Sequence, residues 1–307
     1  MVRRTTRVMS CEATVLAYGD DGSALGGLTE AAIRRRLHQL EARWSRFVPT
    51  TELSRLNARQ GEAVRVSPDT VRLVTALVQG WYLTDEAFDP TLLGALVELG
   101  YAYSRDDLWR RTSLVPTTDR RGRPDAVLID PVHGVVQLPA GTALDPGGLG
   151  KGLAADIVVD ELLADGATGA LVEIGGDLRV GGEPPDRGWT IAVDTARPSG
   201  PALVSVPAGG VATSTSRLRT WTVDGEHRHH LIDPATLRPS TGDAVSCTVL
   251  AGTAAWADAF TKVAFARPAP EAIAIYETHR LAASITTASG RRLTTPNWEA
   301  YAMVTAS

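Results

Sequence analysis

Residues 144–156 constrain this chain more than any other segment, because they place four glycines and a lysine at the start of a predicted helix. The segment reads Leu-Asp-Pro-Gly-Gly-Leu-Gly-Lys-Gly-Leu-Ala-Ala-Asp. Apolar residues then recur at helical spacing up to Leu163, and Gly166 stands where such a helix would end. A glycine-rich helix start exposes backbone N–H groups at the positive end of the helix dipole. Together with Lys151, these groups would suit a phosphate.

Two common phosphate-binding patterns do not fit the segment. A Walker loop needs Ser or Thr directly after its lysine, and this chain has Gly152 there. A dinucleotide-binding fingerprint that starts at Gly148 needs a third glycine where the chain has Leu153. A tight turn that only caps a core helix therefore stays an alternative interpretation.

Composition indicates an ordinary globular protein. Of the 307 residues, 44% are hydrophobic and 21% are charged, and the net charge is −4. The charge argues against nucleic acid as a partner. No apolar stretch is long enough to span a bilayer, which argues against membrane insertion. Cys11 and Cys247 are far apart in the sequence, as is typical of buried thiols in a reducing compartment, so we expect a cytoplasmic protein.

Hydrophobic periodicity predicts helices mixed with many hairpins. Helices are expected after Thr29, with an apolar stripe from Ile33 to Phe47, after Ser67, after residue 150, and over residues 254–265 and 270–278. Single strands are expected over residues 7–18, 170–174, 189–194, 202–206 and 244–251. Two short strands are expected over residues 127–138, and hairpins over residues 220–232 and 284–295. This mixture favours an α+β fold with largely antiparallel sheets.

Two constellations invite a hydrolase or metal-site interpretation, and neither is strong. Ser214, His230 and Asp233 contain the residue types of a serine hydrolase, but no Gly-x-Ser-x-Gly turn surrounds Ser214. In residues 227–230, strand alternation puts His227 and His229 on one face and His230 on the other, so three ligands do not converge. The same alternation puts His230 on the face of Ile232.

Asp258 lies in an otherwise apolar helix, with Thr261 and Lys262 on the same face. One interpretation is a surface Asp–Lys pair, worth about half a kcal/mol. The other is a carboxylate directed at Mg²⁺ on a pyrophosphate, because Mg²⁺ binds a few protein oxygens and keeps phosphates as partners.

Seven segments occur in an order that resembles one family. They are residues 52–57, 88–91, 145–156, 175–177, 212–214, 230–234 and 257–259. Together they resemble the ApbE-type FAD:protein FMN transferases, from about Met9 to Phe265. The resemblance implies an ApbE-like α+β fold, with residues 1–307 as one domain of two intertwined parts and an FAD cleft between them.

The resemblance also implies a reaction. Members of the family bind FAD with Mg²⁺, break its pyrophosphate, release AMP and attach FMN to a threonine of an acceptor flavoprotein. An FAD pyrophosphatase that uses water, and an FAD-binding protein without turnover, stay as alternatives.

By position, the resemblance assigns site residues. His230 would be the base that takes the threonine proton. Residues expected at FAD are Met9, Phe47, Ala87, Phe88, Asp89, Asp145, Lys151, Asp177 and Ile232. Residues expected at the metal are Gly148, through its carbonyl, and Asp258, Thr261 and Lys262.

The chain departs from the family pattern at two charged positions. Lys262 stands where the family has a metal-binding threonine, so its ammonium would replace part of the metal's charge, or Thr261 would reach in instead. Glu173 stands where the family has an asparagine and adds a negative charge near a site for an anion.

Overall fold

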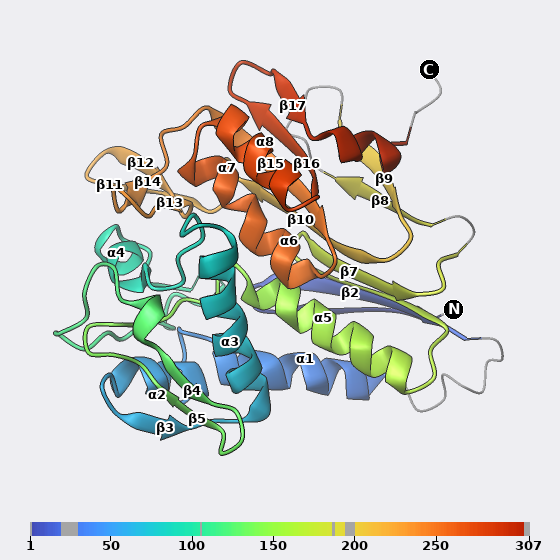
Figure 1. Cartoon of the computed structure of the whole chain (residues 1–307). Coiled ribbons are helices and arrows are strands. Elements are labelled where there is room, and N and C mark those ends of the chain that lie inside the picture. Colours follow the sequence, from blue (N-terminus) through green and yellow to red (C-terminus); the bar gives the residue numbers. More distant parts are fainter. Residues whose placement is uncertain (1, 20–29, 105, 186–187, 194–199, 304–307) are drawn as a thin grey trace. The chain divides into compact units, whose positions relative to one another are not determined.

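The computed structural model describes residues 2–19, 30–104, 106–185, 188–193 and 200–303 (Figure 1). The chain divides into two compact units, and each is built from separate stretches of sequence. Unit 1 contains Met1–His38, Lys151–Thr215 and Gly242–Ser307, and unit 2 contains Gln39–Gly150 and Ser216–Thr241. One ApbE-like domain over residues 1–307 with an FAD cleft between its parts stays a prediction.

The centre of unit 1 is an antiparallel sheet in the order β1-β2-β6-β7-β10-β15-β16-β17. Its strands are Val2–Val8, Cys11–Tyr18, Gly169–Ile174, Asp177–Gly182, Gly209–Thr215, Ala244–Ala251, Ala282–Thr287 and Arg292–Thr294. A separate hairpin pairs β8 (Trp189–Val193) with β9 (Ala202–Val206). The predicted α+β class with largely antiparallel sheets is confirmed.

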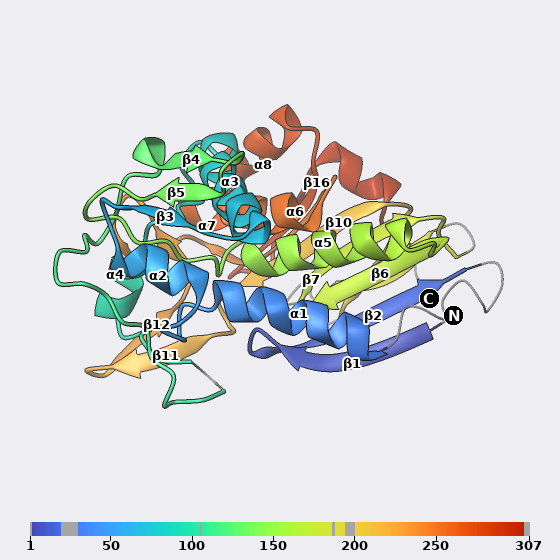
Figure 2. The ribbon, with the colours of Figure 1, turned by 90° about the horizontal axis from the view of Figure 1, so that it is seen from below.

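Helices cover one face of this sheet. Seen from below, α5 (Gly150–Ala164) lies over β6 and β7, and α6 (Ala254–Thr261) lies beside it over β10 (Figure 2). The same unit contains α7 (Val263–Ala266), α8 (Ala269–Thr278) and the short helix η2 (Pro296–Ala300). Because α5 is buried on several sides, its apolar pattern extends around the helix, as in Ala154, Val158 and Val159.

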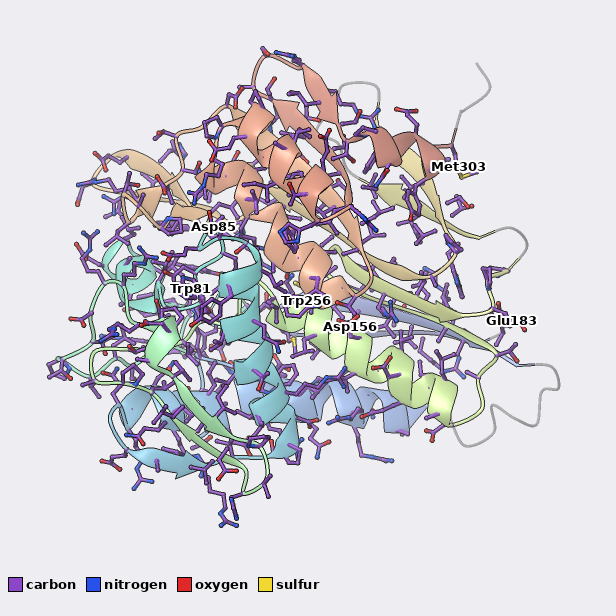
Figure 3. All side chains as sticks on the ribbon, in the orientation of Figure 1. Trp81, Asp85, Asp156, Glu183, Trp256 and Met303 are labelled. Atoms are coloured by element: carbon purple, nitrogen blue, oxygen red, sulfur yellow. The ribbon has the colours of Figure 1, made fainter. Side chains whose placement is uncertain are left out.

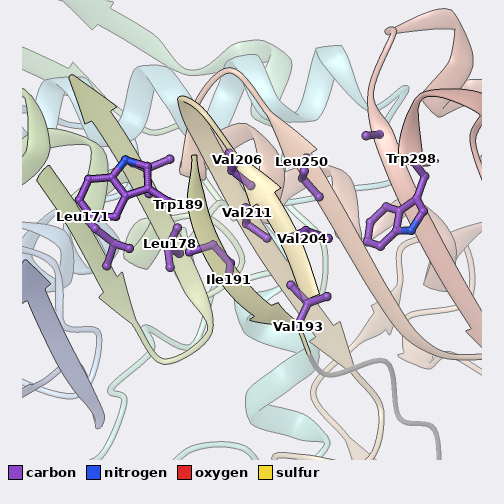
Figure 4. Packing of buried hydrophobic residues seen from close by; sticks show 12 residues of the cluster. Leu171, Leu178, Trp189, Ile191, Val193, Val204, Val206, Val211, Leu250 and Trp298 are labelled. Carbon is purple, nitrogen blue, oxygen red and sulfur yellow. The ribbon is translucent and has the colours of Figure 1, made fainter. Parts of the chain in front are cut away.

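The opposite face of the sheet packs against the β8–β9 hairpin and η2 (Figure 4). Strand alternation directs one set of residues from each layer into this core. The labelled members are Leu171, Leu178, Trp189, Ile191, Val193, Val204, Val206, Val211, Leu250 and Trp298. The middle strands of the sheet are therefore covered on both faces.

The first strand is wrong in the sequence prediction. In place of one strand over residues 7–18, β1 and β2 form a hairpin in which Val8 pairs with Cys11. Met9 and Ser10 form the two-residue turn with φ of 50° and 59°, the geometry of a type I′ turn. The prediction missed it because neither residue is Gly, Asn or Asp. Thr29, expected as a helix cap, lies outside the described residues.

Unit 2 is built around α3, with short helices and small sheets. Ser67 caps α3 (Pro68–Leu83) by accepting from the Thr70 amide, with Pro68 in the first turn as predicted. The other elements are α2 (Glu52–Ala58), α4 (Leu93–Glu98), η1 (Pro124–Ala126), β3 (Ala63–Arg65), β4 (Leu128–Asp130), β5 (Val135–Gln137), β11 (Thr220–Val223), β12 (Glu226–His229), β13 (Ile232–Asp233) and β14 (Arg238–Pro239). Helix α1 (Glu30–Trp44) contributes residues to both units.

The expected helix over residues 254–265 is broken at Lys262 into α6 and α7. The carbonyl of Asp258 is occupied by side chains, because Thr261 Oγ1 and Lys262 Nζ both donate to it, at 2.6 and 2.8 Å. The amide of Lys262 bonds instead to the carbonyl of Ala259. This side-chain competition tightens the helix and ends its regular ladder.

No helix in the described part of the chain is long and apolar enough to cross a membrane.

Candidate active site

Four charged side chains meet in unit 1, at the first turn of α5, the start of β7 and the end of α6. Lys151 Nζ forms an ion pair with Asp177 and lies 3.8 Å from Asp258 Oδ2. Lys262 Nζ forms an ion pair with Asp258 Oδ1. We call these four residues the lysine–aspartate cluster. Sequence analysis assigned all four to FAD or to the metal, and the fold brings them together.

The approach of α5 to α6 positions the cluster. A Cβ on Gly152 would lie 2.5 Å from the carbonyl oxygen of Ala254, so only glycine permits this packing. One turn later Asp156 accepts hydrogen bonds from the amides of Ala254 and Ala255, at 2.8 and 2.9 Å. Figure 3 shows Asp156 on α5 beside the start of α6. The carboxylate therefore caps the helix that carries Asp258.

The turn before β7 places Asp177. Gly175 and Gly176 have φ of 57° and 95° and join β6 to β7, with Ile174 paired to Asp177. Glu173 Oε1 accepts from the amide of Gly176 at 2.7 Å, so this carboxylate stabilises the turn. Burial raises the pKa of Glu173, which favours its neutral form.

The two aspartates of the cluster are both buried, and the neighbouring charges give them different pKa values. Burial and the charge of Asp258 raise the pKa of Asp177, to about 7. Burial also disfavours ionisation of Asp258, but the ammonium groups of Lys262 and Lys151 outweigh it and lower the pKa of Asp258 to about 2. Asp258 is thus the carboxylate that stays charged, and Asp177 can donate to it when protonated.

Asp258 is only 2% exposed, so the interpretation as a surface pair is wrong. Its Oδ2 is buried, and among the described residues a protonated Asp177 is the donor available to this carboxylate. Thr261 Oγ1 donates to the carbonyl of Asp258 and lies 2.7 Å from Ser214 Oγ. Ser214 therefore joins this site as a neighbour of Thr261, and its contact gives no indication of a nucleophile.

In unit 2, the glycine-rich loop is held largely by its own hydrogen bonds. The amide of Gly147 donates to Asp145 Oδ1 at 3.1 Å, and the amides of Leu149 and Gly150 donate to the carbonyl of Pro146. Among the described residues, the amide of Gly148 has no acceptor. The loop therefore offers a ligand fewer N–H groups than its glycine content predicts.

Asn57 fixes the start of this loop. Its side-chain amide exchanges two hydrogen bonds with the backbone of Leu144, at 2.9 and 2.8 Å. Glu52, five residues earlier, accepts from the amide and hydroxyl of Ser67, at 3.0 and 2.7 Å, and from the hydroxyl of Thr70. The matching segment of residues 52–57 therefore stabilises the fold around the loop, through the hydrogen bonds of Asn57 and Glu52.

Arg46 connects two predicted FAD residues in unit 2. Its Nε lies 3.3 Å from Asp145 Oδ1, and its guanidinium lies 4.2 Å from the ring centre of Phe47 and 4.8 Å from that of Tyr101. Its Nη1 donates to Thr112 Oγ1 at 2.7 Å. Sequence analysis missed Arg46, because one arginine at a helix exit gives no distinctive signal.

The segment of residues 87–89 is more deeply buried than a surface that stacks on flavin. Ala87 and Phe88 are 2% and 3% exposed. Asp89 accepts from the amide and hydroxyl of Thr91 and forms an ion pair with Arg121 at 2.6 Å. These contacts fix the turn after α3, and its role at FAD stays a prediction.

His230 lies in a bend between β12 and β13, so the predicted strand alternation with Ile232 is wrong. His229 organises the bend, since its Nδ1 accepts from the amide of Leu231 at 3.3 Å and its Nε2 lies 3.1 Å from the carbonyl of Ser240. Burial lowers the pKa of His229 and favours the neutral ring that these two bonds require. The sequence considered alone suggested His229 only as a possible metal ligand, so this structural role was not predicted.

Two predicted residues remain, Met9 and Ile232. Met9 is half-buried in the β1–β2 turn of unit 1. Ile232 is half-buried in unit 2, where β13 pairs it with Pro239. The structure thus places the predicted site residues in both units, and their roles stay predictions.

Comparison with known proteins gives consistent matches. A model of the ApbE family matches residues 9–285. The FAD:protein FMN transferase of Vibrio cholerae is 29% identical over 236 residues, which cover 72% of this chain and 68% of that protein. The one from Haemophilus influenzae is 27% identical over 283 residues, covering 86% and 80%. The crystal structure of the ApbE protein from Thermotoga maritima is 23% identical and covers 99% of each chain, with a TM-score of 0.83.

Proposed function

Because the chain belongs to the ApbE family, we propose that it is an FAD:protein FMN transferase that attaches FMN to a threonine of an acceptor flavoprotein and releases AMP. The family resemblance inferred from the motifs is confirmed. The observation that carries the proposal is the lysine–aspartate cluster, which puts buried charge on the first helical turn after the glycine-rich loop.

The proposed reaction is a phosphoryl transfer. The threonine oxygen attacks the phosphorus on the FMN side of the pyrophosphate, the bond from that phosphorus to the bridging oxygen breaks, and AMP leaves with the bridging oxygen. His230 takes the proton of the threonine hydroxyl. Such a reaction depends on positioning, neutralisation of phosphate charge and a base near the attacking oxygen. An imidazole suits the role of base because its ordinary pKa is near neutral pH.

Different parts of the chain support different roles. Lys151 provides positive charge for the pyrophosphate, and the amide of Gly148 is available to a phosphate oxygen. Phe47, half-buried and in contact with Arg46, provides an aromatic surface for one flat ring of FAD. The bend ordered by His229 holds the backbone next to His230.

We include Mg²⁺ in the proposal because Asp258 offers a carboxylate oxygen as a ligand. Its buried Oδ2 is the type of ligand that Mg²⁺ prefers, and one or two carboxylates with substrate phosphates commonly suffice. Within the described ranges, no three His, Cys, Asp or Glu side chains gather to hold a metal by themselves. When bound, the ion would neutralise pyrophosphate charge, with Asp258 as a protein ligand in unit 1. The carbonyl of Gly148, in unit 2, stays a prediction from the family resemblance.

Two alternatives differ in what happens to the flavin. An FAD pyrophosphatase would release free FMN and AMP, and a non-catalytic FAD-binding protein would release neither. We also propose a cytoplasmic location, which rests only on the sequence argument from Cys11 and Cys247.

The test combines the chain, FAD and a purified acceptor flavoprotein, and follows covalent yellow fluorescence on the acceptor after denaturing electrophoresis. The matched control is the same acceptor with its modified threonine replaced by alanine. The proposal predicts flavin fluorescence on the acceptor that keeps its threonine and none on the alanine variant. AMP production with no labelled acceptor would favour the pyrophosphatase, and FAD binding without AMP would favour the carrier.

A further inference from the structure

The chain uses lysine at only two positions, and both lie in the lysine–aspartate cluster. The chain has 31 lysines and arginines in total. Lys151 and Lys262 are the two lysines, and the other 29 residues are arginines. Arginine forms ion pairs elsewhere in the described residues, as in the pairs of Arg121 with Asp89 and of Arg36 with Glu161. A compact, strongly hydrated ammonium differs chemically from the planar guanidinium fork. The cluster is thus the place where this chain presents point-like positive charges.

The ammonium of Lys262 contacts two oxygen atoms of Asp258. Its Nζ donates to the carbonyl of Asp258 at 2.8 Å and forms an ion pair with Oδ1 of the same residue. The side chain of Lys262 is 16% exposed, and that of Asp258 is 3% exposed. The ammonium therefore occupies one of the two carboxylate oxygens that a divalent ion would use.

The hydroxyl of Thr261 is also engaged, so it does not replace the carboxylate oxygen that Lys262 occupies. Its hydroxyl donates to the carbonyl of Asp258 and also lies within hydrogen-bond distance of Ser214 Oγ. A metal ion on Asp258 would have to remain on Oδ2, with Lys262 on Oδ1 and Lys151 3.8 Å away. Like charges around one carboxylate repel each other, so Lys262 weakens the hold of this site on a divalent ion.

We propose that Lys262 is a built-in cation on Asp258 that supplies charge for the FAD pyrophosphate and makes FAD binding largely independent of Mg²⁺. The inference rests on the proposed function, because FAD is its ligand. Lys262 supplies positive charge and takes no proton, whereas His230 takes the proton of the threonine hydroxyl.

The experiment measures FAD affinity by titration calorimetry, in EDTA and in saturating MgCl₂, with KCl adjusted so that ionic strength stays equal. Wild type is compared with Lys262→Thr, which removes the ammonium, and with Lys262→Met, which keeps most of the apolar stem. Arg267→Thr is the matched control, because it removes a positive charge that forms an ion pair with Glu271, at 3.5 Å. Far-UV circular dichroism checks that each variant is folded.

Wild type and Arg267→Thr should lose less than about threefold in FAD affinity when Mg²⁺ is removed. Lys262→Thr and Lys262→Met should lose about tenfold or more in EDTA and recover in MgCl₂, as expected for the loss of one charged hydrogen-bond partner. A tenfold loss by wild type in EDTA would overturn the inference, whatever the variants do. If wild type binds no FAD in either buffer, the proposed function fails, and the inference fails with it.

Discussion

Replacing Arg46 tests most directly whether this residue holds Asp145 and Phe47, two predicted FAD residues of unit 2, in position. The guanidinium is 4% exposed, and its ion pair with Asp145 spans 3.3 Å. At an effective dielectric constant of about 20, Coulomb's law gives this pair a gross attraction of about 5 kcal/mol. Part of that attraction only offsets the desolvation of the two ions.

Truncation in Arg46→Ala removes more than the ion pair. It also removes the hydrogen bond to Thr112 and the contacts with the rings of Phe47 and Tyr101, and it leaves Asp145 with less compensation. Breaking a buried pair costs about 3–5 kcal/mol, and the 15% exposure of Asp145 favours the lower end. We therefore expect the free energy of unfolding to fall by about 3 kcal/mol.

Urea denaturation, followed by both tryptophan fluorescence and circular dichroism, measures this loss. A double-mutant cycle of Arg46→Ala with Asp145→Asn isolates the pair, and a coupling of about 1–3 kcal/mol is expected. Arg46→Lys keeps the charge but loses the fork, so it should recover only part of the stability. FAD affinity should fall in Arg46→Ala, because Phe47 and Asp145 lose their common support. A coupling below about 0.5 kcal/mol with unchanged FAD affinity would refute the reasoning.

Three further predictions address the base, the aromatic surface and acid stability. His230→Ala should keep FAD affinity in calorimetry and lose about 10²–10⁴ in the rate of flavin attachment, whereas the exposed His227→Ala should not; wild-type rates from His230→Ala would refute the base assignment. Phe47→Ala should weaken FAD binding about tenfold in the same titration, and an unchanged affinity would leave Phe47 a packing residue. Burial opposes ionisation of Glu52, but hydrogen bonds from Thr70 and Ser67 lower its pKa below 4.5, so its stabilisation is present above that pH and lost as pH falls through the lowered pKa. The melting temperature of wild type should therefore exceed that of Glu52→Gln at pH 7, with the gap closing in acid; a gap independent of pH would contradict this sign.

Local patterns in the sequence were sufficient for elements with strong periodic or capping signals. The helix after residue 150 ends at Gly166, whose φ of 95° and following Ala167–Leu162 hydrogen bond form the expected glycine cap. Ser67 and Pro68 likewise mark the start of α3. These signals involve neighbours in the chain, so they can be read without the fold.

Two local features could not be predicted, because the residues that form them carry no recognisable signal. The break at Lys262 results from side chains that take the carbonyl of Asp258, and the Met9–Ser10 turn lacks the usual turn residues. The gathering of Lys151, Asp177 and Asp258 was expected only from family resemblance. Their burial, which sets their charge states together with the neighbouring charges, comes from the packing of α5 and α6 on the sheet.

The central claim is that the chain transfers FMN from FAD to a threonine. The most direct measurement is the ratio of AMP released to FMN covalently attached, with AMP quantified by chromatography and the flavin-bearing acceptor peptide by mass spectrometry. The account predicts a ratio of about one throughout the reaction, with FMN on the threonine, because each transfer breaks one pyrophosphate. AMP that accumulates with an equal amount of free FMN and an unmodified threonine would contradict it.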